Sequence, residues 1–162
     1  MPWTKHCRTK TCLAALAALL LAACVNQQEL TKREIQKFMQ TSAGEFRNDA
    51  GEELVIVPVY SRMIGMDTIY VERTTAAGTS GRIVSLEVGK NGIVQLAYVF
   101  MQQNQWRNLR ENPELFSALL PRDVRPSGTC DIKLAEDMNS VTYACGGGAP
   151  TTYQRVQYQP DH

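Results

Sequence analysis

Arg82-Ile83-Val84-Ser85-Leu86-Glu87-Val88 is the stretch that decides the fold, because its side chains divide into two alternating sets. Val84, Leu86 and Val88 share one face of an extended chain, and Ile83, Ser85 and Glu87 share the other. Lys90-Asn91-Gly92 follows, and Asn-Gly between two such runs is a strong hairpin signal because both residues tolerate positive φ. The return run, Ile93 to Phe100, places Val94, Leu96, Tyr98 and Phe100 on one side. The sequence therefore predicts an antiparallel hairpin at this point.

Short runs rich in β-branched and aromatic residues stand on both sides of the hairpin. The expected strands are Leu54 to Tyr60, Thr68 to Arg73, Cys130 to Leu134, Val141 to Cys145 and Thr151 to Tyr158, and Thr74 to Ser80 is expected to be a flexible loop. Leu54 to Tyr60 is apolar at odd and even positions, so it is either covered on both faces or is an edge strand protected by Pro58. The rhythm is typical of an antiparallel meander.

Two helices are expected beside the strands. Thr31-Lys32-Arg33-Glu34 has the pattern of a capping box, which predicts a helix from Lys32 until Ser42-Ala43-Gly44 stops it. Asn112-Pro113-Glu114 predicts a second, short helix with asparagine as its cap. The apolar face of this second helix comprises Leu115, Phe116, Leu119 and Leu120. The predicted fold class is therefore mainly β, with an N-terminal helix and one short helix before the C-terminal hairpin.

The N-terminus has the pattern of a bacterial lipoprotein signal. Basic residues precede an apolar run from Leu13 to Ala23, and Leu21-Ala22-Ala23-Cys24 has the pattern of a lipobox. A spanning helix needs about 20 apolar residues, so retention of this run as a transmembrane anchor is the weaker interpretation. We expect residues 1–23 to be a signal peptide that is removed, Cys24 to be lipidated, residues 24–29 to form a tether, and residues 30–159 to form a single domain.

A lipidated Cys24 predicts a location in the cell envelope, anchored to a membrane and facing the periplasm. Val25 follows the cysteine, which favours the outer membrane under the sorting rule of enteric bacteria. The signal takes three of the 17 Lys and Arg residues with it, leaving 14 against 16 acidic residues. Nothing in this balance recruits nucleic acid. A small molecule or an envelope protein is the expected partner, and a homodimer is left open.

The cysteines and histidines narrow the chemistry. Cys130 and Cys145 are the two that remain after Cys24 in the processed chain, and an oxidising compartment predicts a disulfide between them. His6 is lost with the signal and His162 is the last residue, so the domain has no internal histidine. This argues against an imidazole-based triad and against a histidine-rich metal site. No metal and no resident cofactor are expected.

The chain from Leu30 to Gln159 resembles the CpcT/CpeT family. The residues that carry the resemblance are Ala43-Gly44-Glu45-Phe46-Arg47-Asn48, Tyr70-Val71-Glu72, Arg82-Ile83-Val84-Ser85-Leu86 with its partner strand, the cysteine-bounded hairpin from Cys130 to Cys145, and the closing strand from Tyr153 to Tyr158. The sequence departs from the family pattern at Gly81, where a tyrosine is usual. The resemblance implies a calyx-like antiparallel β-barrel or curved sheet, and it implies bilin lyase activity.

A barrel of this kind would hold a linear tetrapyrrole or another apolar or aromatic ligand. The pocket candidates are Tyr70, Glu72, Arg82, Tyr98 and Trp106, with Glu72 and Arg82 as polar contacts and the aromatic residues as flat walls. The alternatives are that Glu72 and Arg82 are surface charges and that Trp106 plugs the barrel. No catalytic residue is identified. We expect a binding or envelope-interaction module, and the alternative is a chromophore lyase that attaches a bilin to a protein cysteine.

Overall fold

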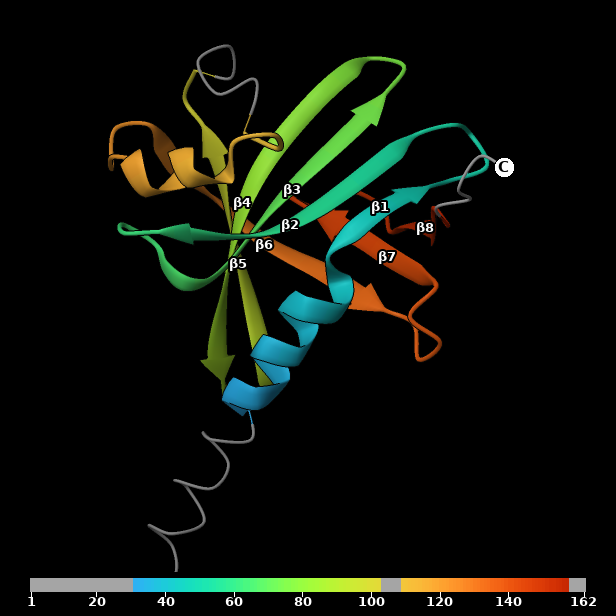
Figure 1. Ribbon diagram of the computed structural model, residues 1–162, viewed down its shortest axis with the longest axis horizontal. Helices are drawn as coiled ribbons and strands as arrows, with labels where there is room; N and C mark the ends of the chain where they lie inside the picture. The colour runs from blue at the N-terminus through green and yellow to red at the C-terminus, as the bar shows by residue number, and fades with distance from the viewer. Residues whose placement is uncertain (1–30, 103–108, 158–162) are drawn as a thin grey trace, which may run out of the picture.

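The computed structural model describes residues 31–102 and 109–157, and it shows a closed antiparallel barrel of eight strands (Figure 1). The strands are β1 (Gly44–Arg47), β2 (Glu53–Ser61), β3 (Gly65–Thr75), β4 (Gly78–Gly89), β5 (Gly92–Phe100), β6 (Val124–Leu134), β7 (Ser140–Cys145) and β8 (Thr151–Arg155). Each strand pairs with the next, and β8 closes the barrel on β1. The prediction of a mainly β, barrel-forming chain with an N-terminal helix is confirmed.

The hairpin that the sequence predicted most strongly is the β4–β5 hairpin. Its register runs from Arg82 opposite Val99 to Gly89 opposite Gly92, with Lys90 and Asn91 at the turn. Gly92 has a φ of 121°, a conformation that side chains with a Cβ rarely adopt. The local turn chemistry therefore sets this register.

The inner face of the sheet is buried, and part of the outer face is buried as well. The inner face fills the barrel with an apolar cluster: Phe46, Leu54, Ile56, Ile69, Val71, Val84, Leu86, Ala97, Cys130, Ile132, Val141, Tyr143 and Tyr153, together with Ile35 of the helix. A second cluster lies on the outer face: Val59, Tyr70, Ile83, Phe100, Leu109, Phe116, Leu119 and Val124. Part of the connection between β5 and β6 supplies its cover. Strand β2 pairs with both β1 and β3, so it is not an edge strand; Leu54, Val55 and Ile56 are buried on both of its faces, whereas Pro58 and Tyr60 are exposed.

That cover contains the second, short helix that the sequence predicted, and it is a 3-10 helix, η2 (Pro113–Ala118). Phe116 and Leu119 are buried, whereas Leu115 and Leu120 are 43% and 45% exposed. The tighter 3-10 turn aligns residues three apart, so only one narrow edge of the segment reaches β2. The prediction of a broad apolar face is therefore correct for Phe116 and Leu119 and wrong for Leu115 and Leu120.

Three further boundaries differ from the sequence prediction. Thr74 to Ser80 is not a loop, because β3 and β4 continue through it and only residues 76–77 turn. Cross-strand hydroxyl contacts, with Thr74 Oγ1 and Thr79 Oγ1 at 3.0 Å, support that extension. Strand β6 begins at Val124 rather than at Cys130, because its first half pairs with β5. Strand β8 ends at Arg155, and Tyr158 lies outside the described residues.

Residues 31–42 form the N-terminal helix, which includes Thr31, one residue earlier than predicted. The helix packs Ile35, Phe38 and Met39 against the inner cluster. Its start lies at the end of the molecule that also holds the β4–β5 turn (Figure 1). No helix in the described ranges has the length and apolar character needed to cross a membrane.

The wall of the barrel between β5 and β6 is completed by a side chain. Paired residues run from Phe100 and Val124 to Leu96 and Thr129, after which the two strands diverge. There the Gln95 amide donates to the Ile132 carbonyl and accepts from the Ile132 N–H, both at 2.9 Å. The side-chain amide takes the place of a strand peptide, which keeps the barrel closed where the backbones separate.

Candidate functional site

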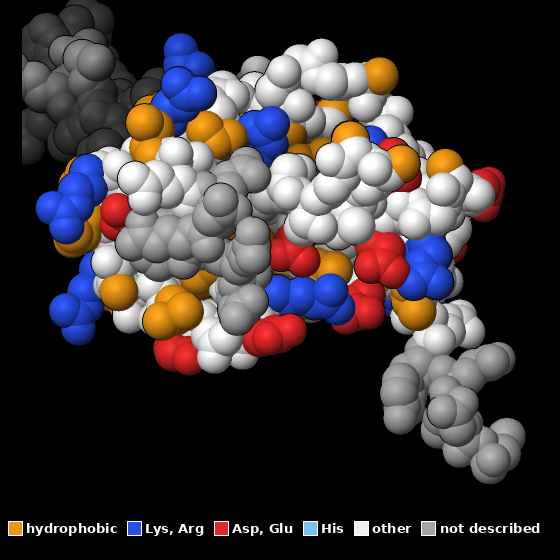
Figure 2. All heavy atoms as spheres, turned by 90° about the horizontal axis from the view of Figure 1, so that it is seen from above, with side chains coloured by type: hydrophobic (Ala, Val, Ile, Leu, Met, Phe, Trp, Pro, Cys, Tyr) orange, Lys and Arg blue, Asp and Glu red, His pale blue; other side chains and the backbone are white. Residues whose placement is uncertain are grey.

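The two ends of the barrel differ in chemistry. We call the end with the turns at residues 48–52, 76–77 and 146–150 the mouth, and the end with the N-terminal helix and the β4–β5 turn the helix end. The inner face near the helix end is apolar, whereas arginine, tyrosine, asparagine and glutamate side chains gather inside the mouth. Figure 2, viewed from above relative to Figure 1, shows acidic and basic side chains interleaved on the upper side.

Arg73 and Arg82 project into the barrel from neighbouring strands. Val71 belongs to the inner cluster, and Arg73 lies two residues further along β3, on the same face. Val84 belongs to the same cluster, and Arg82 precedes it by two residues on β4. Since Val71 pairs with Arg82, the two arginines are diagonal neighbours on the inner face.

Arg73 is held by Glu52, the residue on which several mouth contacts converge. Glu52 Oε2 accepts hydrogen bonds from Arg73 Nη2 at 3.0 Å, from Asn48 Nδ2 at 2.9 Å and from Tyr153 Oη at 3.1 Å. The Glu52 N–H also donates to Asn48 Oδ1 at 2.9 Å. These donors hold the pKa of Glu52 below its usual range, with Arg73 as the largest cause. The Glu52 carboxylate is therefore committed to the fold.

Arg82 has weaker partners. Its Nη1 donates to Ser127 Oγ at 3.2 Å, and its guanidinium lies beneath the backbone of Gly146. Within residues 31–102 and 109–157, no carboxylate lies within ion-pair distance of Arg82. The guanidinium carries five N–H donors, so Arg82 keeps hydrogen-bonding capacity that these contacts do not use.

Two buried tyrosines line the same region. Burial raises the pKa of the Tyr143 phenol, and the positive charges of Arg82 and Arg73 oppose that shift. Burial likewise raises the pKa of Tyr153, which donates to Glu52. Both phenols are therefore neutral donors at neutral pH. In addition, Arg73 Nε is buried without a hydrogen-bond partner in the described part of the chain.

The predicted pocket residues do not come together. Tyr70 lies in the outer cluster with Tyr98 packed against it, and Glu72 accepts a 2.8 Å hydrogen bond from Tyr70 Oη. Arg82 lies on the opposite, inner face. Trp106 lies outside the described residues. Tyr70, Glu72 and Tyr98 therefore belong to the covered outer wall, and of the described candidates Arg82 alone is inside the mouth.

Gly81 explains how Tyr70 fits on the outer wall. A Cβ at Gly81 would lie 2.5 Å from Tyr70 Oη and 2.8 Å from its ring. Tyr70 is fixed there by ring contacts with Phe116 at 5.1 Å and Phe100 at 6.3 Å between centroids. The glycine that departs from the family pattern is thus required by the position of Tyr70.

Sequence reasoning missed Glu52, Arg73, Tyr143 and Tyr153 as mouth residues. The sequence did contain a signal for Arg73, because Ile69, Val71 and Arg73 are spaced two residues apart and so lie on one face of a strand. No local signal identified Glu52, because Tyr153 joins it from 101 residues away. Cys130 and Cys145, in contrast, were paired from the sequence, and the structure joins them across β6 and β7 with a Cα–Cα distance of 4.1 Å.

The rest of the described surface offers shallower features. An open groove of about 250 Å³ lies between the helix and the β2–β3 hairpin, lined by Gln36, Met39, Gln40, Pro58, Met66 and Asp67. No group of three metal-ligating side chains occurs within the residues that the structure describes. Comparisons with protein-family models, with curated proteins and with solved structures find no match to this chain.

Proposed function

We propose that this chain is a periplasm-facing lipoprotein, anchored to the outer membrane through Cys24, whose barrel mouth binds a small molecule that carries an anionic group. The observation that carries the ligand proposal is Arg82. This guanidinium faces the barrel interior and bonds the hydroxyls of Ser127 and Tyr143 but no carboxylate among the described residues, whereas its neighbour Arg73 is engaged by Glu52. Arg82 is therefore the one of these two inward-facing guanidinium groups that has no carboxylate partner among the described residues.

Neighbouring donors support a carboxylate or a similar anion at this position. The Tyr143 phenol is neutral and lies close to Arg82, and the unpartnered Arg73 Nε lies on the next strand. Arginine pairs with planar carboxylates through two parallel hydrogen bonds, which gives geometric specificity as well as affinity. The ligand would therefore place its anionic group between Arg82 and Tyr143.

The packing of the barrel limits how deeply a ligand enters. Side chains of the inner cluster fill the interior beneath the mouth, including Tyr153, Phe46 and Val84, each of them fully buried. The apolar body of the ligand would thus lie across the mouth rather than along the barrel axis. The propionate groups of a linear tetrapyrrole have the required chemistry, and so does any amphipathic carboxylate.

The lyase alternative receives less support from this arrangement. The pocket expected for it places Glu72 and Arg82 beside Tyr70 and Tyr98, but these residues lie on opposite faces of the sheet. A lyase assay decides it directly. Covalent transfer of a bilin from the purified protein to a cysteine-containing acceptor would establish the enzyme, and noncovalent binding alone would favour the binding module.

Absorbance titration with biliverdin, a linear tetrapyrrole with two propionates, tests the anion site. Arg82→Met should weaken binding about tenfold or more, because a hydrogen-bonded charge pair is worth roughly 1.5–3 kcal/mol. Arg62→Met, an exposed residue in the β2–β3 turn at the opposite end of the strands, is the matched control. The dimethyl ester of biliverdin should bind as weakly to the native protein as biliverdin binds to Arg82→Met. Equal affinity of acid and ester would contradict the proposal.

Replacement of Cys24 by serine tests the anchor. The variant should remain uncleaved or become soluble, whereas the native protein should carry acyl chains at the mature N-terminus. Mass measurement of the purified protein and fractionation of cells report the two outcomes. Unchanged membrane partition of Cys24→Ser would contradict the lipoprotein assignment without affecting the ligand proposal.

A further inference from the structure

The helix end of the barrel carries exposed cations that the fold does not pair. Lys32, Arg33 and Lys37 are exposed on the N-terminal helix, and Lys90 is exposed in the β4–β5 turn. In the described part of the chain, no ion pair involves any of these four residues.

Acidic residues offset only part of this charge. Glu34 is exposed on the same helix, and Glu87 is exposed near the end of β4. Glu136 and Asp137 are also exposed at this end, in the β6–β7 loop, so the excess of cations is confined to the helix, where Lys32, Arg33 and Lys37 against Glu34 leave a net charge of +2. The helix end therefore attracts an anionic surface, although the field is modest and is screened beyond about 8–10 Å at physiological salt.

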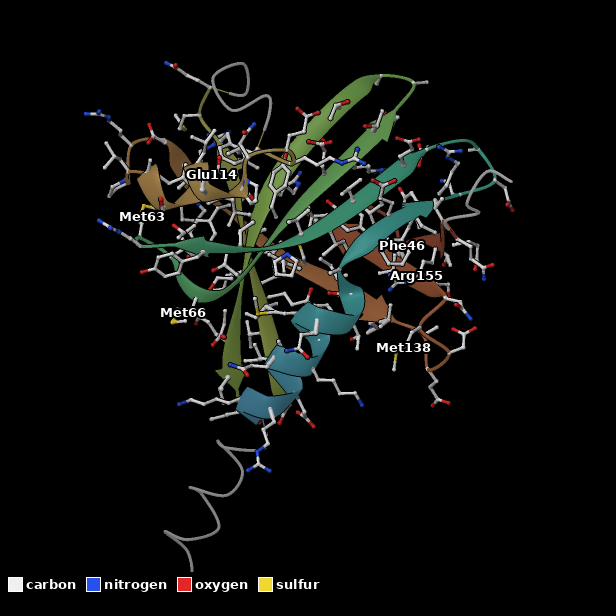
Figure 3. All side chains as sticks on the ribbon, viewed as in Figure 1. Phe46, Met63, Met66, Glu114, Met138 and Arg155 are labelled. Atoms are coloured by element: carbon white, nitrogen blue, oxygen red, sulfur yellow. A yellow bond between two sulfur atoms is a disulfide. The ribbon has the colours of Figure 1, made fainter. Side chains whose placement is uncertain are left out.

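Apolar side chains are exposed on the same end. Met66, at the start of β3, is 76% exposed, and Val88 and Val94 on the β4–β5 hairpin are 41% and 38% exposed. Figure 3 shows Met66 projecting from the molecule beside the β2–β3 turn. Exposed cations combined with exposed apolar side chains are the composition that binds the headgroup region of a bilayer.

The length of the preceding chain brings this end to a membrane. Seven residues, Cys24 to Leu30, precede the first described residue, and fully extended they span at most about 25 Å. This step rests on the proposed lipid anchor at Cys24. With its acyl chains in the bilayer, the start of the helix stays within that distance of the surface.

We infer that the helix end of the barrel lies against the bilayer and contacts anionic phospholipid headgroups through Lys32, Arg33, Lys37 and Lys90, with Val88 and Val94 at the interface. The mouth then opens away from the membrane. The orientation keeps Arg82 accessible to a water-soluble ligand, and it places the helix between the bilayer and the barrel.

Energy transfer from a single fluorophore to a dye in the bilayer measures this orientation. The experiment uses the processed, lipidated protein, which begins at Cys24, on vesicles of phosphatidylethanolamine and phosphatidylglycerol. Val88→Cys labels the helix end and Ala77→Cys labels the mouth, at opposite ends of β4 and roughly 35 Å apart along the strand. Cys130 and Cys145 are bonded to each other, so the new thiol is the one labelled.

The expected result is strong transfer from the label at residue 88 and weak transfer from the label at residue 77. Lys32→Glu with Lys37→Glu should reduce transfer from residue 88 several-fold. The matched double variant, Arg122→Glu with Arg125→Glu, makes the same charge change at exposed residues away from the helix end and should leave transfer unchanged. Equal transfer from both labels, or equal effects of the two double variants, would overturn the inference.

An unlipidated form separates this inference from the anchor. The Cys24→Ser protein without residues 1–23 should still sediment weakly with phosphatidylglycerol vesicles at low salt. Lys32→Glu with Lys37→Glu should lower that binding about tenfold or more, since each basic residue near an anionic surface contributes roughly 1 kcal/mol. Absence of acylation at Cys24 would refute the anchor alone. Vesicle binding that is insensitive to the helix charges would refute the proposed surface.

Discussion

Arg155 and Arg82 are arginines at different ends of the same barrel, and they differ in what their guanidinium groups bind. Arg155 donates to the carbonyls of Met138 at 2.9 Å, Ala43 at 2.8 Å and Thr41 at 2.7 Å. Its guanidinium also lies 4.6 Å from the centre of the Phe46 ring, and Figure 3 shows the two side chains together. Arg82 bonds only hydroxyl groups among the described residues, those of Ser127 and Tyr143.

The difference separates a structural charge from a charge that can bind a ligand. Thr41 and Ala43 lie at the C-terminal end of the N-terminal helix, where carbonyls have no intrahelical donor. Arg155 supplies those donors and thereby joins the helix to β8. Arg82 satisfies no comparable set of backbone groups. A guanidinium whose donors are consumed by the backbone stabilises the fold, whereas one with unused donors can hold an anion that the fold does not provide.

Replacement of Arg155 should give the largest loss of stability. Arg155→Ala leaves three carbonyls without this donor and removes the cation from Phe46, so the free energy of unfolding should fall by about 4 kcal/mol. Arg82→Met should change it by less than about 1 kcal/mol. Urea denaturation followed by circular dichroism measures both. Comparable losses from the two variants would break the distinction between the two arginines.

Removal of the disulfide should affect both stability and binding. Cys130 and Cys145 are 15 residues apart in the sequence, and closing a loop of that length stabilises a fold by about 3 kcal/mol. Gly146 follows directly and covers Arg82, with its N–H bonded to the Thr129 carbonyl. The double change to alanine should therefore destabilise the protein and weaken biliverdin binding, while Arg155→Ala should leave binding to the residual folded protein unchanged. Titration at a temperature where both variants are folded separates the effects.

The β4–β5 hairpin was predictable because its signals are local. Alternation and Asn91-Gly92 fix the turn and the pairing without reference to distant residues. The first half of β6 was not predictable in the same way, since Pro126 and Gly128 interrupt it and its pairing with β5 is across a long connection. The prediction of a loop from Thr74 to Ser80 was wrong for a related reason. The residues there are small and have no apolar alternation, and only cross-strand contacts support the extension of β3 and β4.

The site was predicted in part, and the reason for the failure is physical. The alternation of side chains along a strand correctly places Tyr70 and Glu72 on one face. However, alternation shows which face is the inner one only when the other face is exposed to solvent. Here the segment containing η2 covers part of the outer face, so the sequence has apolar residues on both faces of these strands. Arg155 escaped notice because its partners are backbone carbonyls 112 and 114 residues away, which no side-chain pattern reveals.

Two glycines sharpen the comparison between the arginines. A Cβ at Gly44, whose φ is 145°, would lie 2.5 Å from Arg155 Nη1, and Arg155 cannot move without losing its carbonyls. A Cβ at Gly146, whose φ is 63°, would lie 3.5 Å from the Arg82 guanidinium, which is ordinary contact. Gly44→Ala should therefore cost about 2–3 kcal/mol and Gly146→Ala about 1 kcal/mol. Equal costs would show that backbone conformation, not the arginine, sets the penalty.

Glu52, at the mouth, should make the stability of the fold sensitive to acid. Of the substitutions proposed above, its replacement should have the smallest effect on stability at neutral pH. Hydrogen bonds from Arg73, Tyr153 and Asn48 lower the pKa of Glu52 from its ordinary value of 4.5, so the folded state takes up a proton less readily than the unfolded state. The stabilisation is complete above pH 4.5 and is lost as the pH falls through the lowered pKa. The glutamine of Glu52→Gln cannot titrate. The fall in melting temperature between pH 5 and pH 3 should therefore be smaller in this variant than in the native protein, by roughly a few degrees.

The same substitution leaves Arg73, like Arg82, without a carboxylate partner among the described residues. Without the Glu52 charge, the Arg73 guanidinium loses its ion pair, and the mouth gains one net positive charge. Glu52→Gln should therefore tighten biliverdin binding at pH 7 by roughly threefold, because it removes a negative charge that repels the anionic group of the ligand. Glu136→Gln, an exposed change in the β6–β7 loop, should alter neither the acid profile nor the affinity. Weaker binding by Glu52→Gln would mean that Glu52 itself contacts the ligand, so the anion would have to bind away from Arg73.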